Sequence, residues 1–221
     1  MPPAPPPLRA CLLSGGASHR MGHDKALLLH PEGGTWLERQ LRLLAGLGAP
    51  VTLLSGWPAH LARATALAGP FAAAGVELEL LLEPHGPLGP LVALNRLMDA
   101  HPNERLLLCP TDMPALTPAC LQALLDAASA TPNAIWIASA DVPPGRRQPL
   151  LGLYPSDARP HQSLRRAVAR GERGLQRWLA GEPVHALPLP AAALANVNTP
   201  QELDAWRAEA HTTARVASEP L

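Results

Sequence analysis

The feature of this chain that most constrains its fold is the alternation of short apolar runs with longer amphipathic stretches. Parallel strands that helices cover on both sides are buried on both faces, so they read as continuous apolar runs. Such strands in alternation with helices predict an α/β fold, a single Rossmann-like domain with a mostly parallel central sheet and helices on both faces. The predicted strands lie at 8–14, 50–55, 76–83, 104–109, 134–138, 148–154 and 184–187, and the predicted helices at 35–47, 58–67, 90–101, 117–130, 159–169, 174–179 and 200–210.

The length of 221 residues suits one domain. We place this domain at residues 8–210. Residues 1–7 hold five prolines and are expected to form a disordered tail, and residues 211–221 are expected to form a second one.

Composition excludes several classes of protein. Eighteen basic residues balance eighteen acidic ones, and only seven residues are aromatic, which argues against a nucleic-acid-binding surface. No apolar run reaches the ~18–20 residues that span a bilayer, so no membrane partner is expected. Three widely spaced cysteines, Cys11, Cys109 and Cys120, favour buried thiols and a cytoplasmic protein.

The segment after the first predicted strand has the properties of a phosphate-binding loop. It reads LSGGASHRMGHDK from Leu13 to Lys25, and its glycines would let backbone N–H groups approach anionic oxygens. Lys25 is the only lysine among the eighteen basic residues, and Arg20 adds a second positive charge. An ordinary glycine-rich turn would account for the glycines alone. The spacing fits neither the P-loop nor the dinucleotide fingerprint.

Asp112 directly follows the buried run LLLCPT. In a parallel sheet ligands bind beyond the carboxyl ends of the strands, and Mg²⁺ prefers one or two carboxylates together with phosphate oxygens. Asp112 is therefore a candidate magnesium ligand. The alternative is a turn carboxylate that caps the next helix.

The 13–25 segment resembles the signature Gly-Gly-x-Ser-x-Arg-Met-Gly-x-Asp-Lys of the MobA-like nucleotidyltransferases, and the resemblance extends over residues 8–206. It implies a fold of the nucleotide-diphospho-sugar transferase type. It also implies that GMP is transferred from GTP to molybdenum-bound molybdopterin, which yields molybdopterin guanine dinucleotide and pyrophosphate. The acceptor phosphate, with a second pKa of about 6, is mostly dianionic at neutral pH and needs no general base.

The resemblance also assigns site residues. It implies that Lys25, Arg20 and Asp112 are catalytic, with Asp112 binding Mg²⁺. The nucleotide-binding residues that it implies are Leu13, Ser14, Gly15, Gly16, Lys25, Ser55, Glu83 and Asp112. Ser55 and Glu83 stand where the family has Asn and Asp, which leaves the choice between GTP and CTP open.

The run Asn196-Val197-Asn198-Thr199-Pro200 resembles a second hallmark of the same family. Thr199 followed by Glu202 predicts a helix cap, which does not explain the two asparagines. The resemblance implies that Asn196 and Asn198 contact the acceptor, and a functional role is indicated more strongly for Asn198 than for Asn196. Arg146 and Arg147 could meet a phosphate-bearing substrate, although a solvated basic turn explains them equally well.

The expected partners are GTP and molybdopterin, with a delivery protein for the pterin as a further one, and the chain is expected to be a monomer. Two alternatives stay open. One is a related transferase that uses CTP or another phosphate acceptor. The other is a non-catalytic nucleotide-binding module, which the joint presence of Lys25, Arg20 and Asp112 disfavours.

Overall fold

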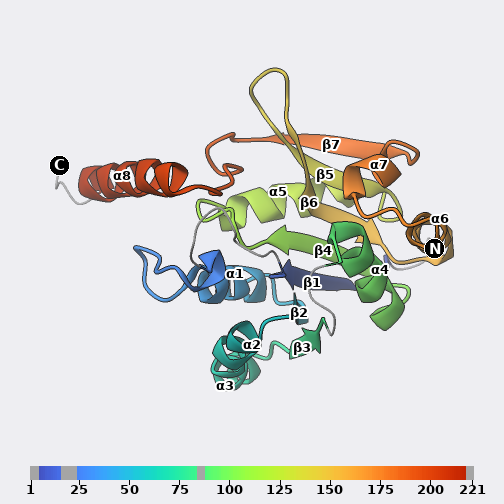
Figure 1. Ribbon diagram of the computed structural model, residues 1–221, viewed down its shortest axis with the longest axis horizontal. Coiled ribbons are helices and arrows are strands. Elements are labelled where there is room, and N and C mark those ends of the chain that lie inside the picture. Colours follow the sequence, from blue (N-terminus) through green and yellow to red (C-terminus); the bar gives the residue numbers. More distant parts are fainter. Residues whose placement is uncertain (1–4, 16–23, 84–87, 218–221) are drawn as a thin grey trace.

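A seven-stranded sheet forms the centre of the molecule in the computed structural model, which describes residues 5–15, 24–83 and 88–217 (Figure 1). The strand order is β3-β2-β1-β4-β6-β5-β7, and β6 alone among the described strands runs antiparallel to its neighbours. The strands are β1 (Leu8–Leu13), β2 (Val51–Ser55), β3 (Leu78–Leu82), β4 (Arg105–Pro110), β5 (Ile135–Ala140), β6 (Arg147–Pro155) and β7 (Val184–Leu189).

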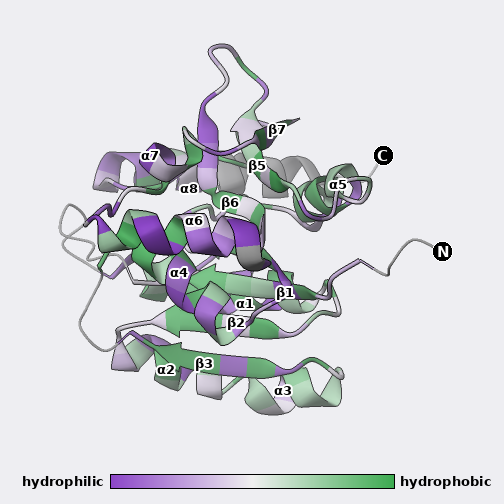
Figure 2. Cartoon of the chain, turned by 90° about the vertical axis from the view of Figure 1, so that its right-hand side faces the viewer, coloured by the Kyte–Doolittle hydropathy of each residue, from purple (hydrophilic) through white to green (hydrophobic). Residues whose placement is uncertain are grey.

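Helices cover both faces of this sheet. One face carries α1 (Trp36–Ala45), α2 (Pro58–Thr65), α3 (Ala68–Ala73) and α5 (Pro118–Ala128), and the other carries α4 (Pro90–Ala100), α6 (Ala158–Ala169) and α7 (Leu175–Leu179). In Figure 2, α4 and α6 lie in front of the sheet and carry hydrophilic residues among hydrophobic ones, whereas β1 and β2 are largely hydrophobic. The predicted fold class is therefore confirmed.

The strands are apolar throughout because their alternate side chains enter two different cores. In β1, Ala10 and Leu12 join the core beneath α1 and α5, whereas Cys11 joins the core beneath α4 and α6. In β4, Leu107 and Cys109 face the first core and Leu106 and Leu108 the second. This period of two on a doubly covered sheet produces the continuous apolar runs of the sequence.

Two predicted helices differ from the structure. The expected helix at 58–67 is α2, which ends two residues earlier at Thr65, and the short helix α3 that follows it was not predicted. Pro70 lies in the first turn of α3, where its missing N–H leaves no hydrogen bond of the helix unmade. The closing helix α8 (Pro200–Ala217) continues beyond residue 210 into the segment expected to be a tail. Neither glycine nor proline interrupts 201–217, and alanine there favours a helix.

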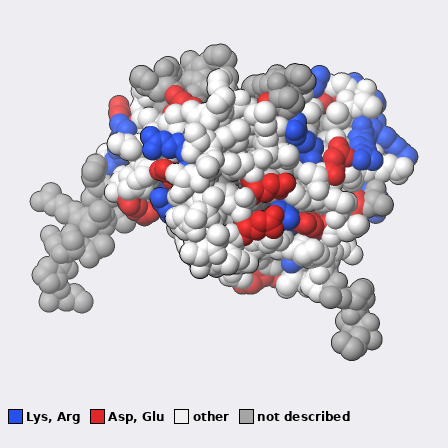
Figure 3. Space-filling view, turned by 90° about the horizontal axis from the view of Figure 1, so that it is seen from below, with Lys and Arg blue, Asp and Glu red and all other residues white. Residues whose placement is uncertain are grey.

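The surface agrees with the balanced charge of the sequence. Acidic side chains lie beside basic ones across the face seen in Figure 3, with large uncharged areas between them. Within the described residues no helix is long and apolar enough to cross a bilayer. All three cysteines are buried and carry free thiols, as predicted.

The topology decides where chemistry can take place. The central pair β1 and β4 is parallel and in a register that sets Leu13 opposite Pro110. The chain therefore leaves both strands at the same edge, with Ser14 and Gly15 beside Thr111 and Asp112. A hydrogen bond of 2.9 Å from the Thr111 hydroxyl to the Leu13 carbonyl joins the two strand ends.

Candidate active site

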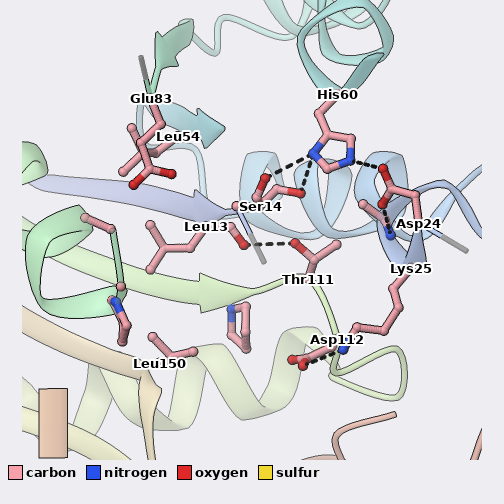
Figure 4. Close-up of a pocket in the computed structure, with 16 residues that line it drawn as sticks. Leu13, Ser14, Asp24, Lys25, Leu54, His60, Glu83, Thr111, Asp112 and Leu150 are labelled. Atoms are coloured by element: carbon pink, nitrogen blue, oxygen red, sulfur yellow. Dashed lines mark hydrogen bonds and ion pairs between the residues drawn. The ribbon is translucent and has the colours of Figure 1, made fainter. Parts of the chain in front are cut away.

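A pocket opens at this edge of the sheet, between the ends of β1 and β4 and the start of α4 (Figure 4). Six predicted nucleotide-binding residues line it: Leu13, Ser14, Gly15, Lys25, Glu83 and Asp112. Its remaining walls include apolar side chains such as Leu54, Ala93 and Leu150. The pocket thus combines an apolar interior with a few charged groups, as small-molecule sites do.

Glu83 supplies the charge at one end of the pocket. It follows β3, is only 8% exposed, and lies so close to Gly15 that a Cβ added there would be 2.7 Å from Oε2 of Glu83. Glycine at position 15 is thus needed for the carboxylate to approach the end of β1. Burial raises the pKa of Glu83, and the charge of Arg96 opposes this rise in part.

Lys25 supplies the charge at the other end. It begins the short 3₁₀ helix η1 (Lys25–Leu27), which Asp24 caps by accepting a 3.0 Å hydrogen bond from the backbone N–H of Ala26. The Lys25 ammonium lies 3.2 Å from Oδ2 of Asp112 and donates to Oδ1 of Asn198 at 2.8 Å. The side chains of Lys25 and Asp112 are 17% and 23% exposed, so this ion pair is only partly shielded from solvent.

The second oxygen of Asp112 is held by the segment before α8. Asn196 donates its amide to Oδ1 of Asp112 at 2.9 Å, and the Val197 N–H donates to the Asp112 carbonyl at 3.0 Å. Gln148, on β6, donates to Oδ1 of Asn196 at 3.1 Å. This bond fixes the orientation of the Asn196 amide, since its oxygen must face Gln148 and its NH₂ must face Asp112.

The helix cap predicted at Thr199 is confirmed. Its hydroxyl accepts from the Glu202 N–H, and Glu202 accepts from the backbone N–H groups of Asn198 and Thr199. The bond from Asn198, followed by those from Thr199, lowers the pKa of the Glu202 carboxyl. The cap therefore holds the backbone of Asn198 while its side chain meets Lys25.

Some predicted residues are placed elsewhere. Ser55 does not line the pocket: it is fully buried, and its hydroxyl donates to the Ser14 carbonyl at 2.7 Å. Gly16 and Arg20 lie outside the described residues. Arg146 and Arg147 are exposed where the β5–β6 connection enters β6.

Sequence reasoning missed several residues of the pocket and its surroundings. Asp24 lies within the signature, and its place before Lys25 in the loop was a usable signal. Thr111 directly precedes Asp112, and Gln148 begins the predicted strand at 148–154. The contacts of both depend on the register between strands. No sequence pattern points to His60, yet it lines the pocket.

Comparison with known proteins agrees with this architecture. The profile of the MobA-like NTP transferase domain matches residues 10–188. A probable molybdenum cofactor guanylyltransferase of Rhodopirellula baltica is 37% identical over 206 residues, which cover 90% of this chain and 92% of the relative. A protein of the same description from Synechococcus elongatus is 34% identical over 202 residues, covering 90% and 96%.

Solved structures share the fold. Molybdopterin-guanine dinucleotide biosynthesis protein A from Archaeoglobus fulgidus superimposes with a TM-score of 0.69 at 18% identity, over 92% of this chain and 99% of that one. A CMP:2-keto-3-deoxy-manno-octonic acid synthetase complexed with CTP gives 0.69 at 14% identity, over 94% and 99%. The profile match and the sequence relatives together show that the chain belongs to the family of MobA-like NTP transferases.

Proposed function

We propose that this protein is a molybdenum cofactor guanylyltransferase, which transfers GMP from GTP to molybdenum-bound molybdopterin and releases pyrophosphate. The observation that carries the proposal is the cluster of Lys25, Asp112, Asn196 and Asn198 at one end of a pocket whose other end holds Glu83. The names of the relatives at 37% and 34% identity support the choice of reaction.

The chemistry asks for charge neutralisation and positioning. The acceptor phosphate is mostly dianionic at neutral pH because its second pKa is about 6, so no side chain has to remove a proton. Attack on the α-phosphate of GTP brings two anions together, which an ammonium group held in place can assist. We assign this role to Lys25 and, by its place in the signature, to Arg20, while the backbone of Gly15 and Gly16 cradles the phosphates.

Asp112 fits a magnesium ion of the kind that binds with a nucleotide. It presents one carboxylate to the pocket, with both oxygens held by donors, and Mg²⁺ is commonly bound by one or two carboxylates together with phosphate oxygens. When bound, Mg²⁺ would supply positive charge to the triphosphate. Asn196 and Gln148 keep the Asp112 carboxylate oriented for it, and Asn198 directs Lys25 toward the same place.

Glu83 favours guanine as the base. An ionised carboxylate only accepts hydrogen bonds. Guanine presents two neighbouring donors, N1–H and the N2 amino group, whereas cytosine presents an acceptor beside its one amino group. We also propose that Leu13 and Ser14, which line the same pocket, bind the nucleotide, and that Ser55 acts through Ser14 instead of contacting the nucleotide.

The remaining assignments follow from the same reaction. Asn196 and Asn198 contact Asp112 and Lys25, and we propose that they also contact the acceptor phosphate. A covalent cysteine intermediate is disfavoured because burial raises the pKa of the Cys11 and Cys109 thiols far above neutrality. We propose a cytoplasmic monomer, whose free thiols would suit a reducing compartment. A delivery protein would bring the pterin.

The reaction can be tested by measuring pyrophosphate release with each of the four NTPs, with and without molybdenum-bound molybdopterin and Mg²⁺. We expect release with GTP only when the pterin and Mg²⁺ are both present. Release with CTP alone would contradict the guanine assignment. Nucleotide binding without release in any mixture would instead favour a non-catalytic module.

Lys25→Ala and Asp112→Asn are each expected to lower kcat by about 10²–10³-fold, because each removes a charge aimed at the reacting phosphates. The Lys25→Arg variant is also expected to lose most activity, because a guanidinium is larger than the compact ammonium group and would crowd the phosphates. Circular dichroism and thermal unfolding serve as controls for the fold. Near wild-type turnover in the Lys25→Ala or Asp112→Asn variant would refute the assigned roles.

Glu83→Gln is expected to weaken GTP binding by about ten- to hundred-fold, through loss of a charged hydrogen bond. The same change should stabilise the ligand-free protein at about pH 8, because a raised pKa means that ionising Glu83 destabilises the folded state. The gain should shrink toward about pH 4.5, where the carboxyl group of the unfolded chain is also protonated.

Calorimetric titration with GTP and thermal unfolding at the two pH values measure both effects of Glu83→Gln. The matched control is Glu77→Gln, at an exposed glutamate before the start of β3. Glu77→Gln should change neither the affinity for GTP nor the thermal stability. Unaltered GTP affinity in Glu83→Gln would show that this carboxylate does not read the base.

A further inference from the structure

His60 lies inside the pocket but has no part in the chemistry described above. It belongs to α2, which begins directly after the end of β2, and it is 2% exposed. The start of α2 brings the imidazole over the carboxyl end of β1 (Figure 4). A buried histidine in such a place needs hydrogen-bonding partners for both of its ring nitrogens.

Both ring nitrogens have partners, and these come from different parts of the chain. Nδ1 lies 2.9 Å from the hydroxyl of Ser14, 3.0 Å from that of Ser55 and 3.0 Å from the Ser14 carbonyl oxygen. Nε2 lies 2.7 Å from Oδ2 of Asp24. The imidazole therefore bridges Ser14 and Asp24, the residues on either side of the glycine-rich segment 15–23.

One assignment of protons gives each ring nitrogen of His60 a hydrogen-bonding partner. Asp24 as a carboxylate can only accept, so Nε2 of His60 carries the proton and donates to it. Nδ1 then accepts from the Ser14 hydroxyl. The Ser55 hydroxyl donates to the Ser14 carbonyl at 2.7 Å, and its oxygen accepts from the Trp57 N–H at 3.1 Å.

Asp24 connects His60 to the turn that begins at Lys25. Its Oδ2 meets His60, and its Oδ1 accepts from the N–H of Ala26 in the 3₁₀ turn that Lys25 begins. With both oxygens engaged, the carboxylate fixes the direction in which the turn leaves the loop. That direction brings the Lys25 ammonium to 3.2 Å from Asp112.

We propose that His60 is a positioning residue for nucleotidyl transfer, which acts through Asp24 to hold Lys25 at the reacting phosphates. The proposal rests on the proposed function, in that it needs Lys25 to assist the reaction. It predicts that the bond from Nε2 to Asp24 matters more for turnover than the bonds at Nδ1. It further predicts that His60 and Lys25 act as one unit.

The chain contains a matched control for a purely structural role. His101 is also buried, at 7% exposure, and its Nε2 lies 2.9 Å from Oε2 of Glu79 and 3.4 Å from the hydroxyl of Thr52. His101 therefore contacts a carboxylate and the hydroxyl of a β2 residue, which are the kinds of partner that His60 also has. Thr52 lies near the start of β2 and Ser55 at its end, so His101 is remote from the pocket.

The test compares His60→Asn, His60→Gln and His101→Asn in steady-state pyrophosphate release from GTP with the pterin acceptor. The glutamine amide can reach Asp24 in place of Nε2, whereas the asparagine amide is too short. We expect His60→Asn to lower kcat by about ten- to hundred-fold while the KM for GTP changes less than about three-fold. His60→Gln should recover kcat to within about three-fold of wild type, and His101→Asn should stay within about two-fold.

A double-mutant cycle tests the route through Lys25. In a Lys25→Ala background, His60→Asn should cause no further loss, because the group that it positions is gone. Three results would overturn the proposal: wild-type kcat in His60→Asn, an equal loss of kcat in His101→Asn, or fully additive losses in the double variant.

A second readout does not depend on activity. Lys25 is the only lysine, so ¹³Cε-lysine labelling gives one NMR signal from the side chain concerned. In the ligand-free protein His60→Asn should shift or broaden this signal, and His101→Asn should leave it unchanged. An unchanged signal in His60→Asn refutes the positioning role even if the protein proves to catalyse another reaction, whereas a shifted signal with an inactive wild type refutes only the proposed function.

Discussion

The ion pair between Lys25 and Asp112 is the interaction around which the pocket is organised. Its two members come from the loops after neighbouring parallel strands, and each is also held by an asparagine from the segment before α8. A partly buried ion pair gains little net free energy, because desolvation offsets much of the attraction between the charges. Its value here lies in geometry, since it keeps a cation and a carboxylate together at the mouth of a nucleotide pocket.

The sheet makes this geometry possible. Pairing of Leu13 with Pro110 ends β1 and β4 at the same level, and the Thr111 hydroxyl ties the two ends together. Side chains of β1 and β4 enter cores on both faces, so neither strand can slide by one residue without exchanging its two sets of apolar contacts. The rigidity of the site is therefore a consequence of burial on both sides of the sheet.

Much of this arrangement could be predicted from the sequence, because it depends on local patterns. Apolar runs indicated the strands, and the family resemblance predicted Leu13, Gly15, Lys25 and Asp112 as residues of one nucleotide site, all four of which line the pocket. Asn198 and Asn196 contact Lys25 and Asp112, and their expected contact with the acceptor stays a prediction.

What could not be predicted depends on the tertiary structure. Ser55 was expected to bind nucleotide from the family resemblance, but its hydroxyl donates to the Ser14 carbonyl and the residue is fully buried. His60 enters because α2 starts immediately after β2, and Gln148 meets Asn196 because β6 runs antiparallel beside β4. No pattern of residue types along the chain encodes either approach.

We propose that, when nucleotide is bound, Asp112 holds the magnesium ion and Lys25 contacts a phosphate oxygen in place of the contact between them. A crystal structure with Mn²⁺ and a non-hydrolysable GTP analogue tests it directly, since anomalous scattering locates the metal. We predict a metal peak bonded to an oxygen of Asp112 and a Lys25 ammonium that donates to a phosphate oxygen, with Glu83 on the guanine. A metal bound without Asp112, or a Lys25 side chain that contacts Asp112 and no phosphate, would contradict the claim.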